Sequence, residues 1–431
     1  MLDIKLIREH PGAVKASEKK RGRDSAIVEQ VFKLDEDWRK ELKKVEELKH
    51  KRNVVSQEIN QAKKDKKEKE ASKKIKEMKD VVEEIKEREY NSNELLHQRN
   101  ELLKKIGNIL DKEVPAGKDE NGNKELRKWG KIAKPNFSLK DHIELGLELD
   151  LIDLDTAAAV SGARFYYLKN EAVLLDLALQ RFAVDILLKH GFAMHWPPFM
   201  LNKAALEGGV NLAEFDDTIY KIEGEDLYLI GTSEHPLLAL KKDKVLQEQE
   251  LPQKIGGIST CFRKEAGAHG RDTKGIFRVH QFNKIEQIVI CKPEESAKYF
   301  KEMQLISEYI FQQLEIPYRV VAVCSGDIGN KQSLQYDIEA WFPGQNDQKG
   351  AYREVTSCSN CLDYQAVTLN TKFISKNGER KYVHMLNNTA LATSRVIVAI
   401  LENFQTKEGA VKIPKVLWPY TNGIKEIKRR K

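Results

Sequence analysis

Hydrophobic side chains recur every three or four residues along a proline-free stretch, residues 27–110, in which Gly107 is the only glycine. Spacings that alternate between three and four form the seam of a coiled coil. The intervening register positions Glu89, Ser92 and Arg99 are polar. The stretch therefore predicts two long helices that pack along one seam. The seam residues are Leu34, Trp38, Val45, Leu48, Val55 and Ile59 in the first half, and Ile75, Met78, Val82, Ile85, Leu96, Leu103, Ile106 and Leu110 in the second.

A polar segment, residues 63–74, separates the two predicted helices, which favours an antiparallel hairpin, called the arm below. A helix rises 1.5 Å per residue, so about 35 residues would reach about 50 Å. Between Gln61 and Asp80, nine lysines and five acidic residues leave a net charge of +4. Mixed charge of this kind is typical of a solvated helix face. A lysine excess near the tip of an arm also suits binding to a phosphate backbone, and the sequence leaves both interpretations open.

Turn-forming residues at 114–117 and 121–123 mark a linker, beyond which the hydrophobic pattern changes. Apolar and polar residues alternate as in strands, and longer helical patterns cover residues 171–189 and 391–405. We expect an α+β fold, with an N-terminal coiled-coil hairpin (domain 1–115) and a domain (116–431) built on an antiparallel sheet flanked by helices. The chain ends in a short basic tail, residues 424–431, expected to be disordered.

Amino-acid composition limits the cellular compartments and partners that we expect. The 431 residues are 41% hydrophobic and 32% charged, with a formal net charge of +7, which permits an anionic partner. Five cysteines give no disulfide framework, so a reducing compartment is expected. The N-terminus lacks the apolar core of a secretory signal, and no uncharged apolar run of 18 residues occurs. We expect a cytoplasmic protein with no membrane contact.

The stretch 262–286 carries the strongest chemical signal. Arg263 and Arg278 flank a glycine-rich loop and are predicted to lie on paired strands facing one another. Glycines let a bulky polyanion approach the backbone, and the planar fork of arginine suits phosphate oxygens. Glu265 and Glu286 add carboxylates for an ammonium or hydroxyl group. A charged surface hairpin is the simpler alternative, although it rarely places His, Phe and Arg together at a strand end.

Three further segments carry candidate chemistry, while the glycine-rich phosphate loops of common nucleotide-binding folds are absent. In segment 231–236 a hydroxyl and Glu234 follow a strand. Taken alone, this segment is better interpreted as a helix N-cap with Glu234 in the first turn. Glu354 and Ser357 are oxygen ligands suited to Mg²⁺ beside phosphates. Arg395 lies near the start of an apolar helix, where a charge is costly unless it meets an anion.

Cys358 and Cys361 form a single CxxC pair. One pair cannot complete a tetrahedral zinc site, and the sequence has no matching second pair. We therefore interpret both cysteines as ordinary thiols and expect no zinc.

These segments together resemble a known family. The arginine hairpin resembles motif 2 of class II aminoacyl-tRNA synthetases, residues 384–405 resemble motif 3, and residues 179–201, with Pro197 and Pro198, resemble motif 1. Four sequence segments are similar to those of seryl-tRNA synthetases: TSEHPL, FRKEAG with GIFRVHQF, EVTSCSN and LNNTALATSR. The segment CFRKEAGAHGRDT suggests the cytosolic eukaryotic type. The resemblance covers the whole chain, including MLDIKLIRE and the arm. The class I signatures HIGH and KMSKS are absent.

The resemblance implies an ATP-dependent ligase that forms seryl-adenylate from L-serine and then charges tRNA(Ser). It also implies a homodimer, Mg²⁺ bound with ATP, and an arm that grips the long variable arm of the tRNA. Two alternatives remain: a paralogue that activates serine without charging tRNA, and a non-catalytic coiled-coil protein that binds RNA.

Site residues follow from the same resemblance. The catalytic residues would be Arg263, Arg395 and Glu354. Arg263 would hold the α-phosphate and the serine carboxylate, Arg278 the far phosphates, and Phe282 the adenine. Arg395 would cover the other adenine face and reach the γ-phosphate. The ATP-binding residues would be Arg263, Lys264, Glu265, Arg278, Val279, Phe282, Glu354, Val355, Thr356, Ser357 and Arg395.

Serine would be bound by residues from several segments, and Mg²⁺ by Glu354 and Ser357. Glu286 is the expected partner of the substrate hydroxyl. The serine-binding residues would be Thr232, Glu234, Arg263, Glu286, Asn387 and Thr389.

Overall fold

The computed structural model describes residues 1–431 except 134, 210–215, 266–273, 347 and 431, and it divides into two compact units. The units are Met1–Gly107 and Asn108–Lys431. Among the described residues, no helix combines the length and apolarity needed to cross a bilayer.

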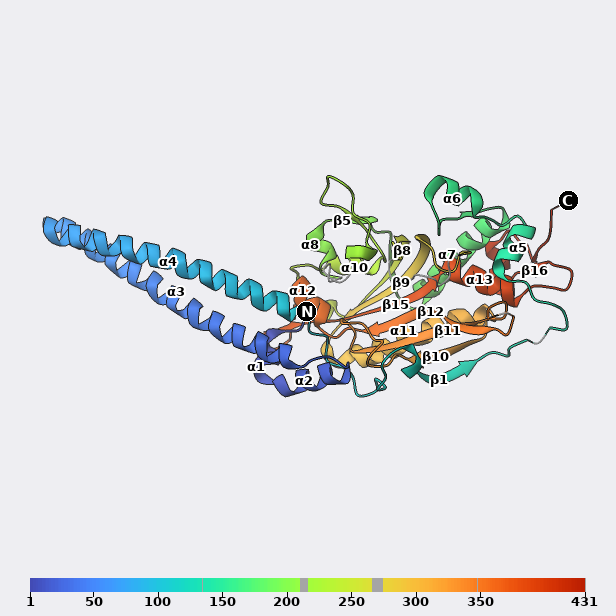
Figure 1. The fold of residues 1–431 in the computed structure, drawn as a ribbon, viewed down its shortest axis with the longest axis horizontal. Helices are drawn as coiled ribbons and strands as arrows, with labels where there is room; N and C mark the ends of the chain where they lie inside the picture. The colour runs from blue at the N-terminus through green and yellow to red at the C-terminus, as the bar shows by residue number, and fades with distance from the viewer. Residues whose placement is uncertain (134, 210–215, 266–273, 347, 431) are drawn as a thin grey trace. The chain divides into compact units, whose positions relative to one another are not determined.

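The first unit is entirely helical. Its elements are α1 (Ile4–Glu9), α2 (Pro11–Lys20), α3 (Ala26–Lys64) and α4 (Glu68–Leu103). Helices α3 and α4 run side by side and form the arm (Figure 1), which confirms the predicted antiparallel hairpin. Only residues 65–67 separate the two helices, so most of the predicted polar joint at 63–74 is helical. A charged sequence with good helix formers continues a helix as long as a neighbouring helix packs against it.

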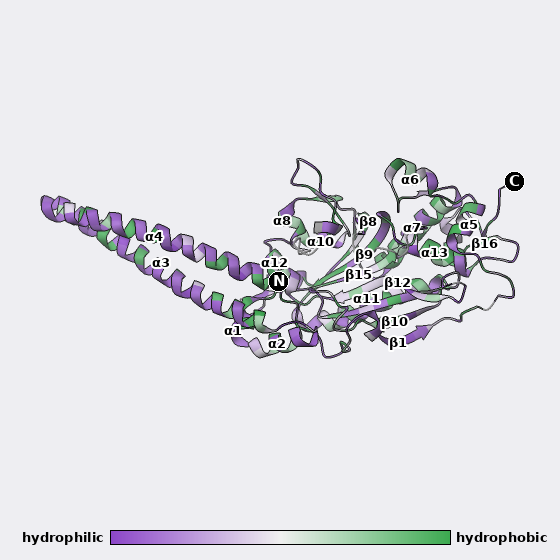
Figure 2. Cartoon of the chain, viewed as in Figure 1, coloured by the Kyte–Doolittle hydropathy of each residue, from purple (hydrophilic) through white to green (hydrophobic). Residues whose placement is uncertain are grey.

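The seam of the arm is narrow. Val45 and Val55 of α3 and Ile85 of α4 are buried as predicted. Figure 2 shows that hydrophilic residues predominate along both helices. Val81 is buried in place of the predicted Val82, and Ile75 is 38% exposed. The seam therefore shifts by one residue in this part of α4.

A buried charge cluster replaces hydrophobic residues at the base of the arm. The carboxylate of Asp35 receives hydrogen bonds from Arg8 (2.7 and 2.8 Å), Arg39 (3.0 Å) and Arg99 (2.9 Å). Burial alone would raise the pKa of Asp35, but the hydrogen bonds from Arg8 and Arg99 lower it below its ordinary value. The guanidinium of Arg99 also lies 4.8 Å from the centroid of the Trp38 ring. The polar register position predicted at Arg99 thus holds an ion pair that links α3 and α4, and polar residues of this kind fix helix register.

The second unit is built on an eight-stranded sheet in the order β1-β10-β11-β12-β15-β9-β8-β4. Neighbouring strands are antiparallel except β4 and β8. The antiparallel sheet confirms the predicted α+β fold. The strands are β1 (Lys124–Trp129), β10 (Tyr318–Ala322), β11 (Leu334–Phe342), β12 (Ala351–Asn360), β15 (His384–Ala392), β9 (Gln281–Cys291), β8 (Gln253–Phe262) and β4 (Ala193–His195).

Long helices pack on one face of this sheet. They are α7 (Glu171–Lys189), α11 (Ser296–Gln313) and α13 (Thr393–Asn403). Because side chains alternate along a strand, neighbouring residues serve opposite faces. Asn388 of β15 donates to the Met303 carbonyl and the Ser307 hydroxyl of α11, whereas Asn387 donates to Glu234 on the other side. The face opposite the long helices therefore remains for the candidate site.

Short elements surround the sheet. The helices are α5 (His142–Glu148), α6 (Asp155–Ser161), α8 (Lys203–Leu206), α10 (Glu234–Ala239) and α12 (Tyr364–Leu369). The strands are β2 (Ile152–Asp153), β3 (Tyr167–Leu168), β5 (Met200–Leu201), β6 (Tyr228–Leu229), β7 (Val245–Gln247), β13 (Lys372–Ile374), β14 (Arg380–Tyr382), β16 (Val411–Lys412) and β17 (Glu426–Ile427).

The expectation of a disordered tail is wrong for the residues that the structure describes. Strand β17 pairs with β16, and Ile427 is buried. Arg430 donates to Glu171 at 2.9 Å. The tail is basic, and the prediction of disorder considered only its charge. Burial of the apolar Ile427 side chain holds the tail in place.

We expect Asp35→Asn to lower the free energy of unfolding of the arm by about 3 kcal/mol, because the substitution leaves buried arginine without its anion. Urea unfolding of the full chain, followed by circular dichroism at 222 nm, measures this change. The folded pKa of Asp35 lies below the unfolded value of about 3.9, so the carboxylate stabilises above that pH. The difference from wild type should disappear as the pH falls through the folded pKa.

Asp37→Asn is the matched control on the same helix. The Asp37 side chain is 43% exposed and pairs with Lys40 at 3.7 Å, so its loss should change stability by less than about 0.5 kcal/mol. Equal effects of the two substitutions would contradict a special role for Asp35.

Candidate active site

The predicted site residues converge on the sheet face opposite α11, at the ends of strands β8 and β9. Arg263 follows the last residue of β8, and Arg278 precedes the first residue of β9 by three positions. The expectation that both arginines lie on the paired strands is therefore wrong. The Arg263 amide still donates to the His280 carbonyl at 2.9 Å, which keeps the two flanks of the loop together. Most of the predicted glycine-rich loop, residues 266–273, lies outside the described residues.

Arg263 is held against the two neighbouring segments. Its Nε donates to the Gly231 carbonyl at 3.1 Å, and its guanidinium lies 5.3 Å from the centroid of the Phe282 ring. A guanidinium fixed over an aromatic face keeps its remaining N–H groups oriented for an anion. This contact joins the strand-end segment around Thr232 to the predicted adenine-binding ring.

Arg278 forms an ion pair with Glu265, whose Oε2 lies 2.8 Å from NH1 of the arginine. Glu265 has φ +50°, a strained backbone conformation for a residue other than glycine. Strain of this kind is concentrated at functional sites. Two residues predicted to bind ATP therefore bind each other in this structure.

Arg395 is a charged residue on an apolar helix, and it pairs with the anionic side chain of Glu354. Its NH1 donates to the Glu354 carbonyl at 2.8 Å and lies 3.5 Å from the Glu354 carboxylate. Its guanidinium lies 5.1 Å from the centroid of the Phe277 ring. The predicted partner was ATP, and the protein supplies an additional partner of its own.

Acidic side chains crowd the paired strands β11 and β12. Asp337 pairs in register with Ser357, and Glu339 with Glu354. Burial, followed by the charge of Glu354, raises the pKa of Asp337 well above its ordinary value. Carboxylates that repel one another beside a hydroxyl form the kind of oxygen donor set that Mg²⁺ prefers, so the residues fit the predicted metal.

Protein side chains alone do not complete a metal site. Within the described part of the chain, no three His, Cys, Asp or Glu side chains gather in a way that could hold a metal ion. A cation at Glu354 and Ser357 would need further oxygen ligands, such as the phosphates of a nucleotide.

Glu286 is the centre of the predicted hydroxyl-binding site. It lies on β9, is 2% exposed, and forms an ion pair with Lys284. The Thr232 hydroxyl donates to its Oε2 at 3.0 Å. Thr389 of β15 is its register partner, so both residues lie at the same level of the sheet. A buried carboxylate held by a fixed cation can accept a hydroxyl hydrogen bond.

Glu234 forms a second buried carboxylate cluster. It accepts hydrogen bonds from Lys331 (2.5 Å), Gln365 (2.7 Å) and Asn387 (3.3 Å). Burial alone would raise the pKa of Glu234, but the charge of Lys331 and its hydrogen bonds lower it to about 2. Burial alone would lower the pKa of Lys331, but the charge of Glu234, together with its hydrogen bond and the other acidic groups nearby, raises it. Glu234 thus begins helix α10, in agreement with one interpretation of this segment. Its role in binding a substrate stays a prediction.

Several predicted residues contribute less than their motif suggested. Val279 and Val355 are buried in the hydrophobic core, which leaves only their backbone groups for a nucleotide. Lys264 is exposed and lies 5.9 Å from the centroid of the Tyr220 ring. Thr356 is buried, and its hydroxyl has no hydrogen-bond partner among the described residues.

Four residues of the site escaped the sequence analysis: Lys284, Lys331, Gln365 and Asp337. Lys284 lies two residues from Phe282 and from Glu286, so strand alternation places all three on one face and could have revealed it. The other residues come from segments without a motif, and no pattern in the chain points to them.

The cysteines are free thiols. All five are buried, including Cys358 and Cys361. Burial raises the pKa of the Cys361 thiol to about 12. The two residues of the CxxC pair therefore behave as structural thiols.

The fold and this site define a class II aminoacyl-tRNA synthetase. A family model described as the tRNA synthetase class II core domain (G, H, P, S and T) matches residues 218–404. The model of the seryl-tRNA synthetase N-terminal domain matches residues 1–110. The serine--tRNA ligase of Methanocella arvoryzae is 47% identical, over 99% of this chain and 100% of its own length. The chain belongs to the seryl-tRNA synthetase family.

Solved structures agree with this assignment. The seryl-tRNA synthetase of Pyrococcus horikoshii complexed with ATP is 46% identical, with a TM-score of 0.92, and the match covers 100% of both chains. The cytoplasmic serine-tRNA ligase of Naegleria fowleri in complex with AMP is 39% identical, with a TM-score of 0.87, over 100% of this chain and 99% of its own. Of these two structures, the cytoplasmic enzyme is the less similar, so the expected eukaryotic type gains no support from the pair.

We expect Lys331→Met to lower the free energy of unfolding by about 3–5 kcal/mol, because it leaves Glu234 buried without a cation. The double variant Lys331→Met with Glu234→Gln removes both charges and should recover part of this loss. Urea unfolding of the full chain, followed by tryptophan fluorescence, measures both changes.

Lys381→Met is the control, because Lys381 forms an exposed pair with Glu379 at 2.8 Å. It should change stability by less than about 1 kcal/mol. A double variant whose loss equals the sum of the two single losses would show that Lys331 and Glu234 do not depend on each other.

Proposed function

We propose that this enzyme joins L-serine to ATP, giving seryl-adenylate and pyrophosphate, and then transfers the seryl group to the 3′ end of tRNA(Ser). One observation carries the proposal: a single face of β9 supports both halves of the site. Phe282 lies under Arg263 at one end of this face, and Glu286 forms the buried carboxylate cluster four residues further along. A nucleotide and a small amino acid bound at these places would meet at Arg263.

In the first step, the serine carboxylate attacks the α-phosphorus, a new P–O bond forms, and the bond to pyrophosphate breaks. Arg263 neutralises the carboxylate and the α-phosphate, which otherwise repel each other. Arg278 and Arg395 balance the charge that develops on the leaving pyrophosphate, and Phe282 stacks on the adenine. Catalysis by this arrangement consists of positioning and electrostatic stabilisation, which are the large terms in phosphoryl and nucleotidyl transfer.

Mg²⁺ would be held by Glu354 and Ser357, beside Asp337. When bound, it supplies positive charge to the phosphates. In the second step, a hydroxyl at the tRNA 3′ end attacks the seryl carbonyl, and AMP leaves.

Recognition of serine rests on Glu286. Because Lys284 and Thr232 hold this carboxylate in place, it can accept the substrate hydroxyl without moving. Alanine offers no hydroxyl, so it would lack the hydrogen bond that serine makes to Glu286 and would leave one acceptor position of the buried carboxylate unpaired. Glu234, Asn387 and Thr389 would complete the pocket around the ammonium group and the side chain.

The arm would bind the tRNA through its lysine-rich tip. The net charge of +4 at residues 61–80 attracts phosphates, and double-stranded RNA is read mainly through shape and backbone. Cross-helix ion pairs, such as Lys74 with Glu58 at 2.8 Å, keep the helices paired near the tip. This pairing would present the exposed tip lysines as one rigid surface.

A homodimer in the cytoplasm completes the proposal. Helix α7 exposes Val173, Leu177 and Leu188, which lie within about 60° of one another around the helix axis. Trp196, shortly beyond this helix, is 72% exposed. A stripe of this kind suits an interface with a second copy. Sedimentation equilibrium of the full chain would show the mass of one chain if the dimer is wrong. Five free cysteines fit a reducing compartment.

Arg263→Ala should reduce serine-dependent ATP–pyrophosphate exchange at least about 100-fold, because both reacting anions lose their shared cation. Arg380→Ala is the control, since Arg380 lies exposed on β14. Normal exchange in Arg263→Ala would remove this residue from its assigned role.

Shortening the arm should separate the two steps. Residues 46–84 are replaced by a short Gly/Ser turn, which keeps Val45, Ile85 and the Asp35–Arg99 ion pair at the base. Pyrophosphate exchange should remain within about twofold of wild type, whereas charging of tRNA(Ser) should fall at least about 100-fold as the phosphate contacts are lost. Undiminished charging would show that the arm is not a tRNA contact.

A further inference from the structure

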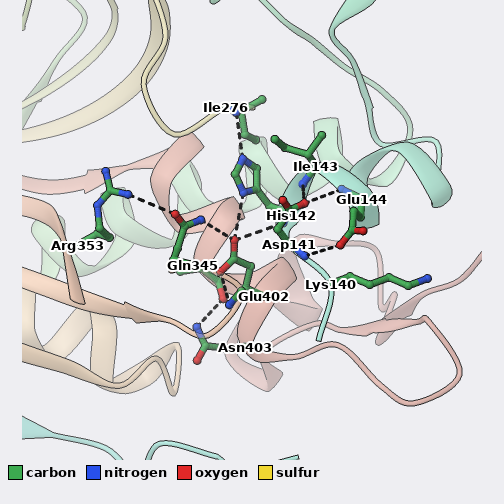
Figure 3. A network of polar contacts seen from close by, with 12 residues as sticks. Lys140, Asp141, His142, Ile143, Glu144, Ile276, Gln345, Arg353, Glu402 and Asn403 are labelled. Atoms are coloured by element: carbon green, nitrogen blue, oxygen red, sulfur yellow. Dashed lines mark hydrogen bonds and ion pairs between the residues drawn. The ribbon is translucent and has the colours of Figure 1, made fainter. Parts of the chain in front are cut away.

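His142, a buried residue that is not predicted to contact a substrate, connects helix α13 with the segment that follows the glycine-rich loop (Figure 3). His142 is the first residue of α5, and Glu402 lies in the last turn of α13, the helix that carries Arg395. Both side chains are buried, and His142 Nδ1 lies 3.1 Å from Oε1 of Glu402. The other ring nitrogen, Nε2, accepts a hydrogen bond from the Ile276 amide at 3.3 Å.

These contacts define the proton positions on the imidazole. The Ile276 amide can only donate, so Nε2 must be the unprotonated nitrogen. Nδ1 then carries the hydrogen and donates to Glu402, which can only accept as a carboxylate. His142 is therefore neutral while both hydrogen bonds exist, and it acts as an acceptor toward the returning side of the glycine-rich loop.

Gly275 lets the loop come this close. Its φ is +82°, and a Cβ atom at this position would lie 2.1 Å from His142 Nε2. Glycine is thus required both by the backbone conformation and by the approach of the imidazole. A side chain that only filled space in the core would not need the backbone at Gly275 to come within hydrogen-bond distance of its ring nitrogen.

The segment held by His142 leads directly to phosphate-binding residues. The centroid of the Phe277 ring lies 4.3 Å from the guanidinium of Arg353 and 5.1 Å from that of Arg395, and Arg278 is the next residue. On the other side, Glu402 also accepts from the Gly344 amide (3.0 Å) and the Gln345 side chain (3.1 Å), and Gln345 accepts from Arg353 (3.3 Å).

We infer that His142 is a positioning residue for ATP. Its imidazole fixes the Ile276 amide, which sets the place of Phe277 and Arg278 relative to Arg395. The inference rests on the proposed function, because Arg278 and Arg395 matter here as ligands of the triphosphate. Loss of the acceptor at Nε2 should weaken ATP binding and leave serine binding unchanged.

Two near-isosteric variants separate the two ring nitrogens. In His142→Asn, the side-chain amide takes the place of Nδ1 and can donate to Glu402, but nothing reaches Ile276. In His142→Gln, the amide oxygen takes the place of Nε2 and can accept from Ile276, while the donor to Glu402 is lost. We expect His142→Asn to raise the calorimetric Kd for ATP about 3- to 10-fold, the effect of one hydrogen bond, and His142→Gln to keep it within about twofold.

Kinetics and stability complete the experiment. In pyrophosphate exchange, His142→Asn should raise the KM for ATP by the same factor and leave the KM for serine and kcat within about twofold. Thermal unfolding of each variant measures the structural effect separately. The inference is overturned if the two variants change the Kd for ATP equally, if neither changes it, or if the wild-type chain binds no ATP.

Failure of the proposed function looks different. If the wild-type chain binds ATP but shows no serine-dependent exchange, the proposed reaction is wrong. The comparison of ATP affinities between His142→Asn and His142→Gln still decides the role of His142.

Discussion

The structure depends on pairing buried carboxylates with cations that belong to the protein. Glu286 with Lys284, Glu234 with Lys331, and Asp35 with its arginines share this arrangement. An isolated buried charge is so costly that the group would otherwise take up or lose a proton. Internal cations keep the carboxylates ionised, and the pKa of Glu234 is lowered to about 2 for this reason.

This pairing has a direct consequence for substrate binding. Lys284 and Lys331 already neutralise the two carboxylates, so in the proposed complex the serine ammonium group would gain little from net charge alone. Selection must then come from hydrogen-bond geometry at the substrate hydroxyl, where Thr232 and Lys284 hold Glu286 in one orientation. A site of this kind is organised before the substrate arrives, which lowers the cost of ordering it during binding.

Local patterns in the sequence predicted a large part of this architecture, and distant contacts account for what they missed. The helix predicted at 171–189 has the same bounds as α7. The spacing of hydrophobic residues predicted the arm, but a one-residue shift of the seam from Val82 to Val81 arises from packing between helices, which periodicity in one helix does not contain.

The candidate site shows the same limit. The motif residues Arg263, Glu286 and Arg395 could be named from short segments alone. Lys331 and His142 could not, because each acts on a partner at least 90 positions away: Lys331 on Glu234, and His142 on Ile276 and Glu402. The residues next to Lys331 and His142 in the sequence form no motif that predicts these contacts. Only the folded sheet brings the partners together.

Strand β9 joins the proposed substrate site to the hydrophobic core, because its side chains point alternately to the two faces of the sheet. Phe282, Lys284 and Glu286 face the site, while Ile285 lies in the main core and Gln287 donates to the Ser307 hydroxyl of α11 at 3.1 Å on the opposite face. Because side chains on a strand alternate, a shift of β9 against the helices moves the Phe282 ring, the Lys284 ammonium group and the Glu286 carboxylate together. In the proposed complex, the distance between the two substrates would therefore stay constant while their common support moves, and the attack geometry at the α-phosphorus would depend on the rigidity of this strand as well as on Arg263.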